Sequence, residues 1–145
     1  MTKKHYLLLF SLALCFVFVG CSGDKKPAGL PQLYSISMTF TQEGEPCVGV
    51  AIVLLPLDES PWSASGLTDA NGRTTFFTYG KYPGVPAGKF RIELSKYETD
   101  TDKDGNPLLY TLIDIDLPPI EIEVTGKDKF EPFDLGKKVR VLVKQ

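Results

Sequence analysis

Residues 66–76 read GLTDANGRTTF and place a turn, Asp69–Gly72, between two short strand-like segments. Asn and Gly tolerate positive φ angles, and an Asp side chain can accept hydrogen bonds from backbone amides two residues further on. Strand-like segments on both sides of such a turn are typical of a β-hairpin. A phosphate or metal loop would need more donors or carboxylates, so we expect this stretch to shape the fold.

Apolar and polar residues alternate with a period of two along much of the chain, and we find no helical stripe. Residues 34–41 and 120–124 alternate, and residues 48–57 form a nearly continuous apolar run, which is typical of a central strand covered on both faces. The sequence therefore predicts an all-β fold, an antiparallel Greek-key sandwich of about seven to nine strands. The other predicted strands are residues 65–68, 73–78, 90–95, 108–117, 130–135 and 139–143.

The N-terminal segment predicts an exported protein that carries a lipid anchor. Lys3 and Lys4 precede an apolar run, residues 6–19, which is shorter than the ~20 residues that a membrane-spanning helix needs. A basic start and a short apolar core are typical of a signal peptide. Phe18-Val19-Gly20-Cys21 resembles the lipobox of bacterial lipoproteins, in which the cysteine is diacylated and becomes the new N-terminus. The alternative is an ordinary signal peptide, or a membrane anchor with an incidental cysteine.

The resemblance implies attachment to a membrane through acyl chains on Cys21. Each buried methylene contributes about 0.8 kcal/mol, so two or three acyl chains hold a protein where one would not. Residues 23–32 read GDKKPAGLPQ and predict a tether that spans at most about 35 Å. In lipoproteins an Asp after the cysteine often signals inner-membrane retention. Ser22 stands there instead, so we expect the outer membrane, with the domain facing the periplasm or the cell surface.

The predicted organisation has three parts: a signal peptide over residues 1–20, a lipid-anchored tether over residues 21–32 and a β-sandwich over residues 33–145. The formal net charge is −2, and −4 without Lys3 and Lys4, so the domain has no electrostatic attraction for nucleic acid. The one histidine of the chain, at position 5, lies in the predicted signal peptide. The domain therefore lacks a Ser-His-Asp or Cys-His arrangement and a histidine-ligated zinc site.

The cysteines agree with this organisation. Cys15 leaves with the predicted signal peptide and Cys21 is the predicted acylation site, so Cys47 remains without a partner for an internal disulfide. We interpret Cys47 as a small buried hydrophobic residue. A reactive or intermolecular thiol is the alternative, although no nearby histidine would lower its pKa.

Three motifs, in order, resemble carboxypeptidase regulatory-like domains. Residues 43–56, EGEPCVGVAIVLLP, resemble the first hairpin of that family. Residues 66–72, followed by Phe76, resemble the second hairpin, and residues 86–92, PAGKFRI, resemble the strand that comes next. Residues 120–135 are a looser match to the closing strands.

The resemblance implies a transthyretin-like (prealbumin-like, Ig-like) sandwich of about seven strands in a small bacterial lipoprotein. Residues 97–117 depart from the shorter versions of the family and predict an inserted hairpin. The family has no catalytic residues to carry over, and its members serve as folding companions, spacers, adhesin repeats and, in some relatives, glycan binders. We therefore expect a protein that is not an enzyme, has no cofactor and serves a structural or interaction role at the cell envelope. A glycan-binding or weak calcium-binding module is the alternative.

Three aromatic residues, Trp62, Tyr79 and Tyr82, lie in predicted loops and are candidate ligand contacts. Aromatic rings in loops can stack on sugar faces or anchor a protein partner, so the partner would be a glycan or an envelope protein. The alternative is that the rings cap the open end of the sandwich.

Residues 100–106 read DTDKDGN and copy the first seven positions of a calcium-binding loop. Position twelve of such a loop requires a bidentate Glu, but Thr111 stands there, although Glu98 could supply a carboxylate. An acidic hairpin tip is the alternative. If calcium binds, we expect an affinity no better than about 10⁻⁴ to 10⁻³ M. The candidate ligands are Asp100, Asp102, Asp104 and Asn106.

Overall fold

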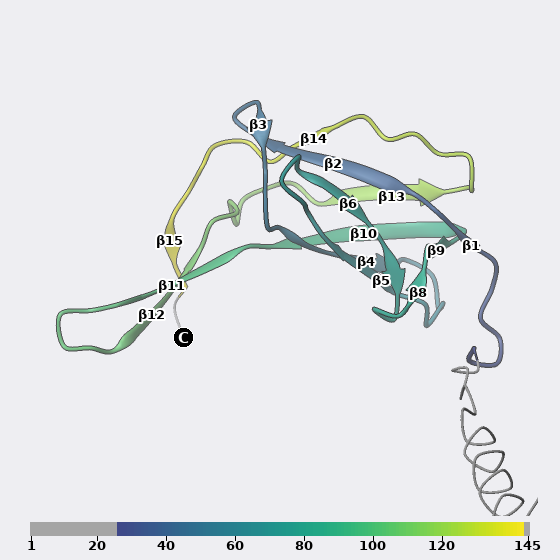
Figure 1. Ribbon diagram of the computed structural model, residues 1–145, viewed down its shortest axis with the longest axis horizontal. Coiled ribbons are helices and arrows are strands. Elements are labelled where there is room, and N and C mark those ends of the chain that lie inside the picture. Colours follow the sequence, from purple (N-terminus) through teal and green to yellow (C-terminus); the bar gives the residue numbers. More distant parts are fainter. Residues whose placement is uncertain (1–25, 144–145) are drawn as a thin grey trace, which may run out of the picture. The chain divides into compact units, whose positions relative to one another are not determined.

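The computed structural model describes residues 26–143 (Figure 1). The strands lie in one compact unit, Pro31–Gln145. The described residues contain strands and turns but no helix, so the predicted all-β class is confirmed. Accordingly, no helix in this part of the chain is long and apolar enough to span a membrane. The predicted signal peptide and Cys21 lie outside the described residues.

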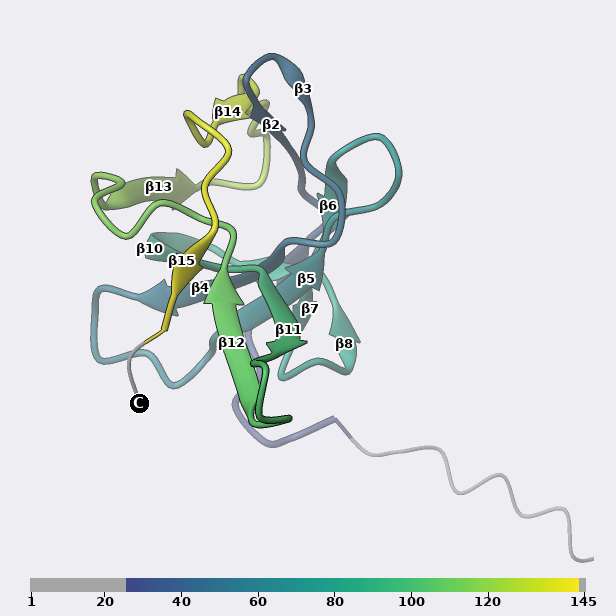
Figure 2. The ribbon, with the colours of Figure 1, turned by 90° about the vertical axis from the view of Figure 1, so that its left-hand side faces the viewer.

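Two sheets form the sandwich, and Figure 2 shows β2 and β14 in one layer and β4 and β10 in the other. The first sheet is antiparallel and has the strand order β13-β10-β4-β5-β7-β8. Its strands are β4 (Ala51–Pro56), β5 (Ala64–Leu67), β7 (Phe77–Thr78), β8 (Tyr82–Pro83), β10 (Gly88–Ser95) and β13 (Ile120–Val124).

The second sheet is built on β2, which pairs antiparallel with β3 and β6 and parallel with β14. The parallel partner comes from near the end of the chain, so β2 joins the first and last parts of the domain. The strands are β2 (Ser37–Gln42), β3 (Glu45–Pro46), β6 (Arg73–Thr75) and β14 (Phe133–Asp134).

Two smaller sheets complete the domain. A two-stranded sheet pairs β1 with β9, and a three-stranded sheet has the order β11-β12-β15. The three-stranded sheet projects from one end of the domain, and β1 lies at the other end (Figure 1). The bounds are β1 (Leu33–Tyr34), β9 (Val85–Pro86), β11 (Tyr97–Thr101), β12 (Pro107–Thr111) and β15 (Val141–Leu142).

The described part of the chain therefore has fifteen strands, seven of them two residues long. Turns and changes of sheet divide stretches that the sequence presents as continuous, which is why more strands are found than predicted. The Greek-key order stays a prediction. The hairpin predicted within residues 97–117 is confirmed, since β11 and β12 pair antiparallel.

The core lies between the two main sheets because the alternating strands turn their apolar residues toward each other. Met38 and Phe40 of β2 and Ile52 and Leu54 of β4 are at most 1% exposed. Fully burying a side chain of this kind contributes about 1.5–3 kcal/mol. The other buried apolar residues are Ile36, Cys47, Val50, Ala64, Phe76, Val85, Phe90, Ile92, Ile113, Ile122, Val124 and Leu135.

The predicted strand of residues 48–57 is buried on one face only, which corrects the expectation of cover on both faces. Ile52 and Leu54 point into the core, whereas Val53 and Leu55 alternate with them and are half-buried. Among the described residues no second layer covers the outer face of the six-stranded sheet, so these side chains are partly open to solvent. An unbroken apolar run does not distinguish these two cases.

The turn at residues 69–72 forms as predicted. The Gly72 amide donates to the Asp69 carbonyl oxygen at 3.0 Å, and Asp69 Oδ1 accepts from the amides of Asn71 (2.8 Å) and Arg73 (3.0 Å). The pairing predicted for the flanking strands is wrong, however. The strand before the turn, β5, pairs within the first sheet, whereas the strand after it, β6, pairs with β2 of the second sheet.

The predicted return strand, residues 73–78, divides at Phe76. Its first half is β6 in one sheet, and its second half is β7, which pairs with β5 in the other. The Phe76 side chain is 2% exposed and fills the core at the crossing. The chain passes so close to β5 that a Cβ on Gly66 would collide with Thr74 Oγ1 and the Thr75 carbonyl oxygen.

Gly72 packs directly against β2 and has a φ of +70°, a backbone angle that residues other than Gly rarely adopt. A Cβ there would collide with the Phe40 carbonyl oxygen and lie 3.0 Å from the Cys47 nitrogen. The Phe40 amide in turn donates to the Gly72 carbonyl oxygen at 2.8 Å. The position therefore requires Gly both for its conformation and for its space.

Three further predicted strands are shorter than expected. Residues 130–135 form a strand only at Phe133 and Asp134. Residues 108–117 continue as a strand only to Thr111, and the chain is irregular from there to residue 119. Residues 139–143 form a strand only at Val141 and Leu142, which are 39% and 47% exposed. These two residues pair with β12 in the projecting sheet and not in the sandwich, so their alternation does not bury a face.

Cys47 is buried, with 3% of its surface exposed, and forms no disulfide. Its Sγ–H donates a weak hydrogen bond to Gln42 Oε1 at 3.7 Å. The interpretation as a small buried hydrophobic residue is therefore confirmed.

Replacing Gly72 by Ala should lower the free energy of unfolding by about 2 kcal/mol or more. A positive φ costs a side chain about 1–2 kcal/mol, and the new Cβ also collides with the backbone of β2. Urea unfolding followed by the fluorescence of Trp62, the one Trp of the chain, measures the change.

Gly44→Ala is the matched control, because its φ is +80° but nothing lies within 4 Å of the added Cβ. The Gly44 variant should lose only the part of the free energy of unfolding that comes from the positive φ, because its Cβ meets no neighbour. Equal losses in the two variants would show that the turn does not pack closely on β2.

Candidate functional site

The structure brings two of the three predicted aromatic contacts together. Trp62 precedes β5 and Tyr79 follows β7, two strands that pair antiparallel. The Tyr79 amide donates to the Ser63 carbonyl oxygen at 3.1 Å, which continues the pairing beyond the strands. The ring centroids of Trp62 and Tyr79 are 5.1 Å apart and their planes are tilted by 47°. The result is a paired aromatic surface at one end of the first sheet.

Tyr79 has an unusual backbone for an aromatic residue. Its φ is +54°, and its side chain is 51% exposed. A positive φ in a residue with a bulky side chain is uncommon and costs about 1–2 kcal/mol. The surrounding turn holds this conformation, because the Gly80 amide donates to the Phe77 carbonyl oxygen at 3.2 Å. Because the Tyr79 side chain is half exposed, packing in the core does not explain its positive φ. The turn instead presents the ring on the surface.

Tyr82 lies apart from this pair. It lies on β8 opposite Thr78, and its partly buried ring has Lys81 Nζ 5.8 Å from the centroid. Among the described residues no ring contact joins Tyr82 to Trp62 or Tyr79. The three predicted contacts therefore do not form one cluster.

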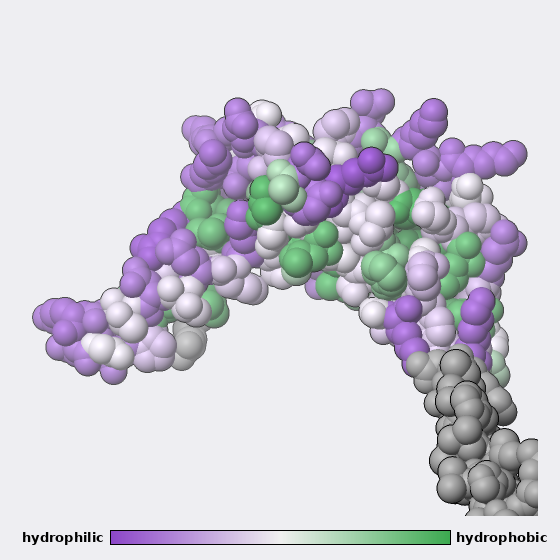
Figure 3. Space-filling view, viewed as in Figure 1, coloured by the Kyte–Doolittle hydropathy of each residue, from purple (hydrophilic) through white to green (hydrophobic). Residues whose placement is uncertain are grey.

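Beside the aromatic pair, an apolar trough of about 500 Å³ crosses the outer face of β4, β5 and β7. Val53, Ser65 and Phe77 form a row across the three strands by their register. Leu67 and Phe77 line the trough and are 63% and 40% exposed. Gly80, which follows Tyr79, also lines it, so the aromatic pair lies next to the trough. Figure 3 shows several separate hydrophobic areas on the domain, some of them at the level of β4 and β5.

The outer face of the first sheet changes from apolar to charged between β4 and β10. No charged side chain lines the trough, but the neighbouring strands β10 and β13 present exposed charges. Arg91 stands opposite Leu55 and Glu93 stands opposite Val53. Clustered apolar surface with a polar border is typical of an interaction site.

Sequence reasoning missed the trough. It placed Val53 in a strand covered on both faces and Phe77 in a predicted strand, residues 73–78, without assigning either to a surface. The deciding fact is that Thr68 and Thr78 are buried, at most 3% exposed, which turns their apolar neighbours Leu67 and Phe77 outward. No pattern in the sequence indicates that these polar residues are buried and the apolar residues beside them are exposed.

The acidic loop forms the same turn as residues 69–73. The Asp102 carboxylate accepts at Oδ1 from the amides of Asp104 and Asn106, both at 2.8 Å, and at Oδ2 from Asn106 Nδ2 at 2.9 Å. The Gly105 amide donates to the Asp102 carbonyl oxygen at 3.0 Å. The hydrogen bonds from the side chain and then the amide of Asn106 lower the pKa of Asp102. The loop is thus the tip of the β11–β12 hairpin.

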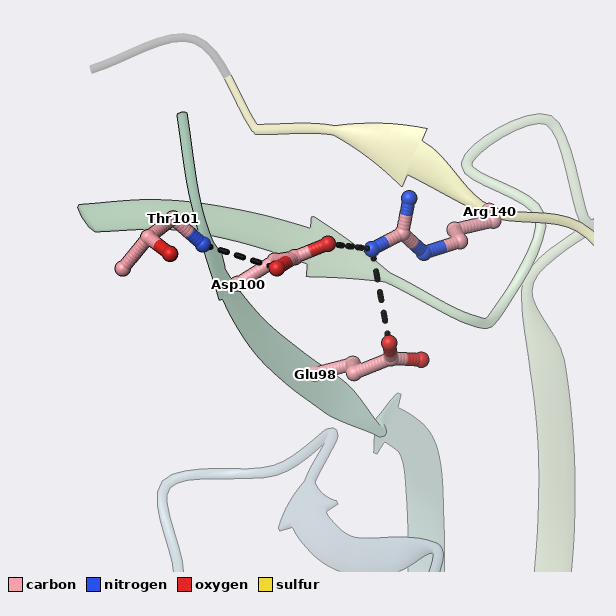
Figure 4. A network of polar contacts seen from close by, with 4 residues as sticks. All are labelled: Glu98, Asp100, Thr101 and Arg140. Carbon is pink, nitrogen blue, oxygen red and sulfur yellow. Dashed lines mark hydrogen bonds and ion pairs between the residues drawn. The ribbon is translucent and has the colours of Figure 1, made fainter. Parts of the chain in front are cut away.

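Asp100 faces Arg140, which crosses to it from the chain just before β15 (Figure 4). Its carboxylate accepts from Arg140 Nη2 at 2.7 Å and from the Thr101 amide at 2.8 Å, and Glu98 Oε1 lies 3.4 Å from the same Nη2. The Thr101 amide first, and then Arg140, hold the pKa of Asp100 below its ordinary value. The guanidinium also lies 3.6 Å from the ring centroid of Tyr110, so Arg140 ties the three strands of the projecting sheet together.

The four predicted calcium ligands are therefore not gathered around one point. Asp100 and Glu98 face Arg140, and the oxygens of Asp102 are occupied by its own loop. Within residues 26–143 no group of three or more His, Cys, Asp or Glu side chains could hold a metal ion. Calcium binding itself stays a prediction.

A second groove, of about 360 Å³, lies where the sandwich meets the projecting sheet. Ile92 and Leu94 of β10 line one side, and the exposed side chains of Tyr97 and Ile115 (59% and 75%) line another. Sequence reasoning missed this groove because it predicted one continuous strand through Ile115. The chain instead leaves β12 at Thr111 and turns around the groove.

Comparisons with known proteins name no family for the chain. No family model matches it, and no curated protein matches it. One similar solved structure is the crystal structure of a 9R-lipoxygenase from Cyanothece PCC8801, with 16% sequence identity and a TM-score of 0.35. The match covers 94% of this chain and 20% of the lipoxygenase chain. A TM-score this low supports no inference about fold or activity.

Replacing Arg140 by Gln should raise the pKa of Asp100 toward the ordinary value for Asp, but not fully, because the Thr101 amide remains. The ionised form is the one that the fold favours. The ionised Asp100 carboxylate therefore stabilises the fold at pH values above the ordinary pKa of Asp. This stabilisation is lost as the pH falls through the lowered pKa. Carboxyl ¹³C NMR across an acid titration measures both values.

The pKa of Asp102 is the internal control, because Asn106 lowers it and Arg140 does not contribute. An unchanged pKa at Asp100 in the variant would show that the ion pair in Figure 4 is not formed in solution.

Proposed function

We propose that this chain is a non-catalytic lipoprotein of the cell envelope whose β-sandwich presents an interaction surface. The surface is the apolar trough together with the Trp62–Tyr79 pair. The observation that carries the proposal is the exposure of Leu67, Phe77 and Tyr79, at 63%, 40% and 51%, on a sheet face that no second layer within residues 26–143 covers. The partner that fits is an envelope protein with a complementary apolar surface.

The shape and rigidity of this surface support binding. Val53 and Ser65 lie on strands that pair on both sides, so a partner meets a fixed surface and little ordering is lost on binding. Buried aromatic anchors dominate the binding energy of most protein interfaces. Phe77 is suited to that role because its rigid ring is 40% exposed, and the half-buried Trp62 adds a second ring nearby.

The envelope location rests on the N-terminal sequence. The lipobox-like residues before Cys21 and the short apolar run support lipid attachment, with Ser22 favouring the outer membrane. A non-catalytic role is supported by the side chains available. The one histidine, His5, precedes the domain, and Cys47 is buried, so neither a histidine base nor an exposed thiol is present in residues 26–143.

Glycan binding is the alternative function, and the aromatic pair favours it. Two adjacent rings tilted by 47° can contact one sugar face and its edge together. In that case Trp62 and Tyr79 carry the affinity, and the trough is peripheral.

Replacing Cys21 by Ser should abolish acylation, because the thiol is the acceptor of the lipid. Metabolic labelling with a palmitate analogue, followed by intact mass, measures the effect. Cys47→Ser is the matched control and should keep the label, since the Cys47 side chain is buried. Labelling of the Cys21 variant would overturn the lipid anchor.

Replacing Phe77 by Ser should reduce capture of the envelope partner at least about tenfold, the effect of losing about 1.4 kcal/mol of binding. Crosslinking in intact cells and quantitative mass spectrometry of the purified lipoprotein measure capture. Ile115→Ser is the matched control, because it removes a more exposed apolar side chain, 75%, that lies outside the trough. Equal capture by both variants would contradict the proposed surface.

The unchanged chain and its Phe77→Ser and Trp62→Ala variants distinguish glycan binding from protein binding. If glycans are the ligand, Trp62 fluorescence changes with envelope polysaccharide fragments, and Trp62→Ala loses retention on them while Phe77→Ser keeps it. If protein binding is correct, the fluorescence is constant across the panel and the Phe77 variant has the larger loss.

A further inference from the structure

The outer face of the second sheet holds a polar pocket of about 390 Å³ that differs in kind from the apolar trough. The outward-facing side chains of β2 form the floor of this pocket. Met38 and Phe40 point into the core, so Ser37 and Thr39 point outward, and Ser35 continues the row of hydroxyl groups. Because the opposite face of the strand is buried, this row is held in a fixed position.

Arg73 borders the row from β6, where it pairs with Thr39. Its Nε donates to Ser37 Oγ at 2.6 Å, which orients the guanidinium. A guanidinium has five N–H donors, and among the described residues the Nη groups of Arg73 have no hydrogen-bond partner. The two outer nitrogens are therefore available for a ligand with paired acceptor oxygens.

Lys129 borders the pocket from the loop between β13 and β14, and Phe130 lines it as well. Neither Arg73 nor Lys129 forms an ion pair with a carboxylate of residues 26–143. Two unpaired cations beside hydroxyl donors form a site for an anion. The planar fork of Arg and the point charge of Lys are both common phosphate ligands.

Asp128 is the one carboxylate that lines the pocket, and its own loop satisfies it. Oδ2 accepts from the amides of Thr125 (2.7 Å) and Gly126 (2.8 Å), and Oδ1 accepts from Thr125 Oγ1 at 2.6 Å. The Thr125 hydroxyl is the main cause of a lowered pKa for Asp128. These bonds fix the loop that carries Lys129 and direct donors at the negative charge of Asp128.

The position of the pocket suggests the source of the anion. The row begins at Ser35, directly after β1, where the chain enters the domain. The loop after β13 lies at that same end (Figure 1), and hydrophilic side chains project from it in Figure 3. Ser35 follows Cys21 by fourteen positions, which extend to about 50 Å at most. A pocket on so short a tether stays close to the headgroups of the anchoring membrane.

We propose that this pocket binds a phosphate group, and that its source is a phospholipid headgroup of the membrane in which the protein is anchored. The proposal rests on the lipid anchor of the proposed function. Arg73 takes two phosphate oxygens, Lys129 takes a third, and the hydroxyls of Ser37 and Thr39 complete the site. Anchoring raises the effective concentration of headgroups at the pocket, so a millimolar affinity suffices to orient the domain on the membrane. That orientation leaves the apolar trough, on the other sheet, free for a partner.

The test uses the mature acylated protein in maltoside micelles, which contain no phosphate, and follows the Arg73 Nε–Hε and Thr39 amide signals by ¹⁵N NMR. One arm adds inorganic phosphate, and the other adds dihexanoyl phosphatidylglycerol below its micelle concentration. Both arms should give saturable shifts at millimolar concentration. A response to the lipid alone supports the headgroup source, whereas a response to phosphate alone overturns the headgroup source. No saturable shift in either arm overturns the pocket.

Three charge-removing variants test the residues in the same arms. Arg73→Gln should weaken binding at least about tenfold and Lys129→Gln about fivefold, the Thr39 amide reporting both. Arg91→Gln is the matched control, since it removes an exposed Arg from the outer face of the other sheet. An equal loss in the control overturns the site in favour of general charge attraction. If the Cys21 anchor fails its own test, the phosphate arm on the unacylated chain still decides the pocket.

Discussion

The amide of Phe40 donates to the carbonyl oxygen of Gly72 at 2.8 Å, and the two main sheets depend on this contact. The turn that contains Gly72 takes the chain from one sheet to the other, so it must pass close to β2 without a side chain in the way. Thr68 satisfies the backbone around the same crossing. Its Oγ1 donates to the Cys47 carbonyl oxygen at 2.7 Å and accepts from the Val50 amide at 2.8 Å. An unsatisfied buried group there would cost about 1–3 kcal/mol, and the described residues contain no such side-chain atom.

The strand alternation that fills the core also gives the two outer faces different chemistry. On the first sheet it turns Val53 and Phe77 outward as an apolar surface, and on the second it turns Ser37 and Thr39 outward as a polar one. Each face is rigid because the opposite side of its strands is buried. The domain can therefore hold a partner on one face and an anion on the other, and both depend on side chains placed on a common scaffold.

Local patterns predicted the features that depend on neighbouring residues. The alternation of β2, the turn at Asp69 and the hairpin tip at Asp102 all follow from a few adjacent positions. The pairing of strands does not, because the partner of each strand depends on distant chain segments. The change of sheet at Phe76 is an example of this.

The candidate sites were less predictable than the fold for the same reason. Trp62 and Tyr79 were candidates from their positions in loops, but their contact comes from the pairing of β5 with β7. Arg140 reaches Asp100 across forty positions, and no spacing in the sequence indicates that the acidic loop has a basic partner. The lipid anchor is predicted from residues outside the described part of the chain.

The parallel pairing of β14 with β2 has a consequence for the order of assembly. The Leu135 amide donates to the Thr41 carbonyl oxygen at 2.7 Å, and Gln42 Nε2 reaches the Lys137 carbonyl oxygen ninety-five positions away. A chain that emerges from its N-terminus, at a ribosome or through a translocation channel, therefore leaves one side of β2 open until its final segment arrives. Such an open strand is a template for pairing with other nascent molecules. Residues 133–137 thus close this side of β2, and release of the chain before they pair would favour its aggregation.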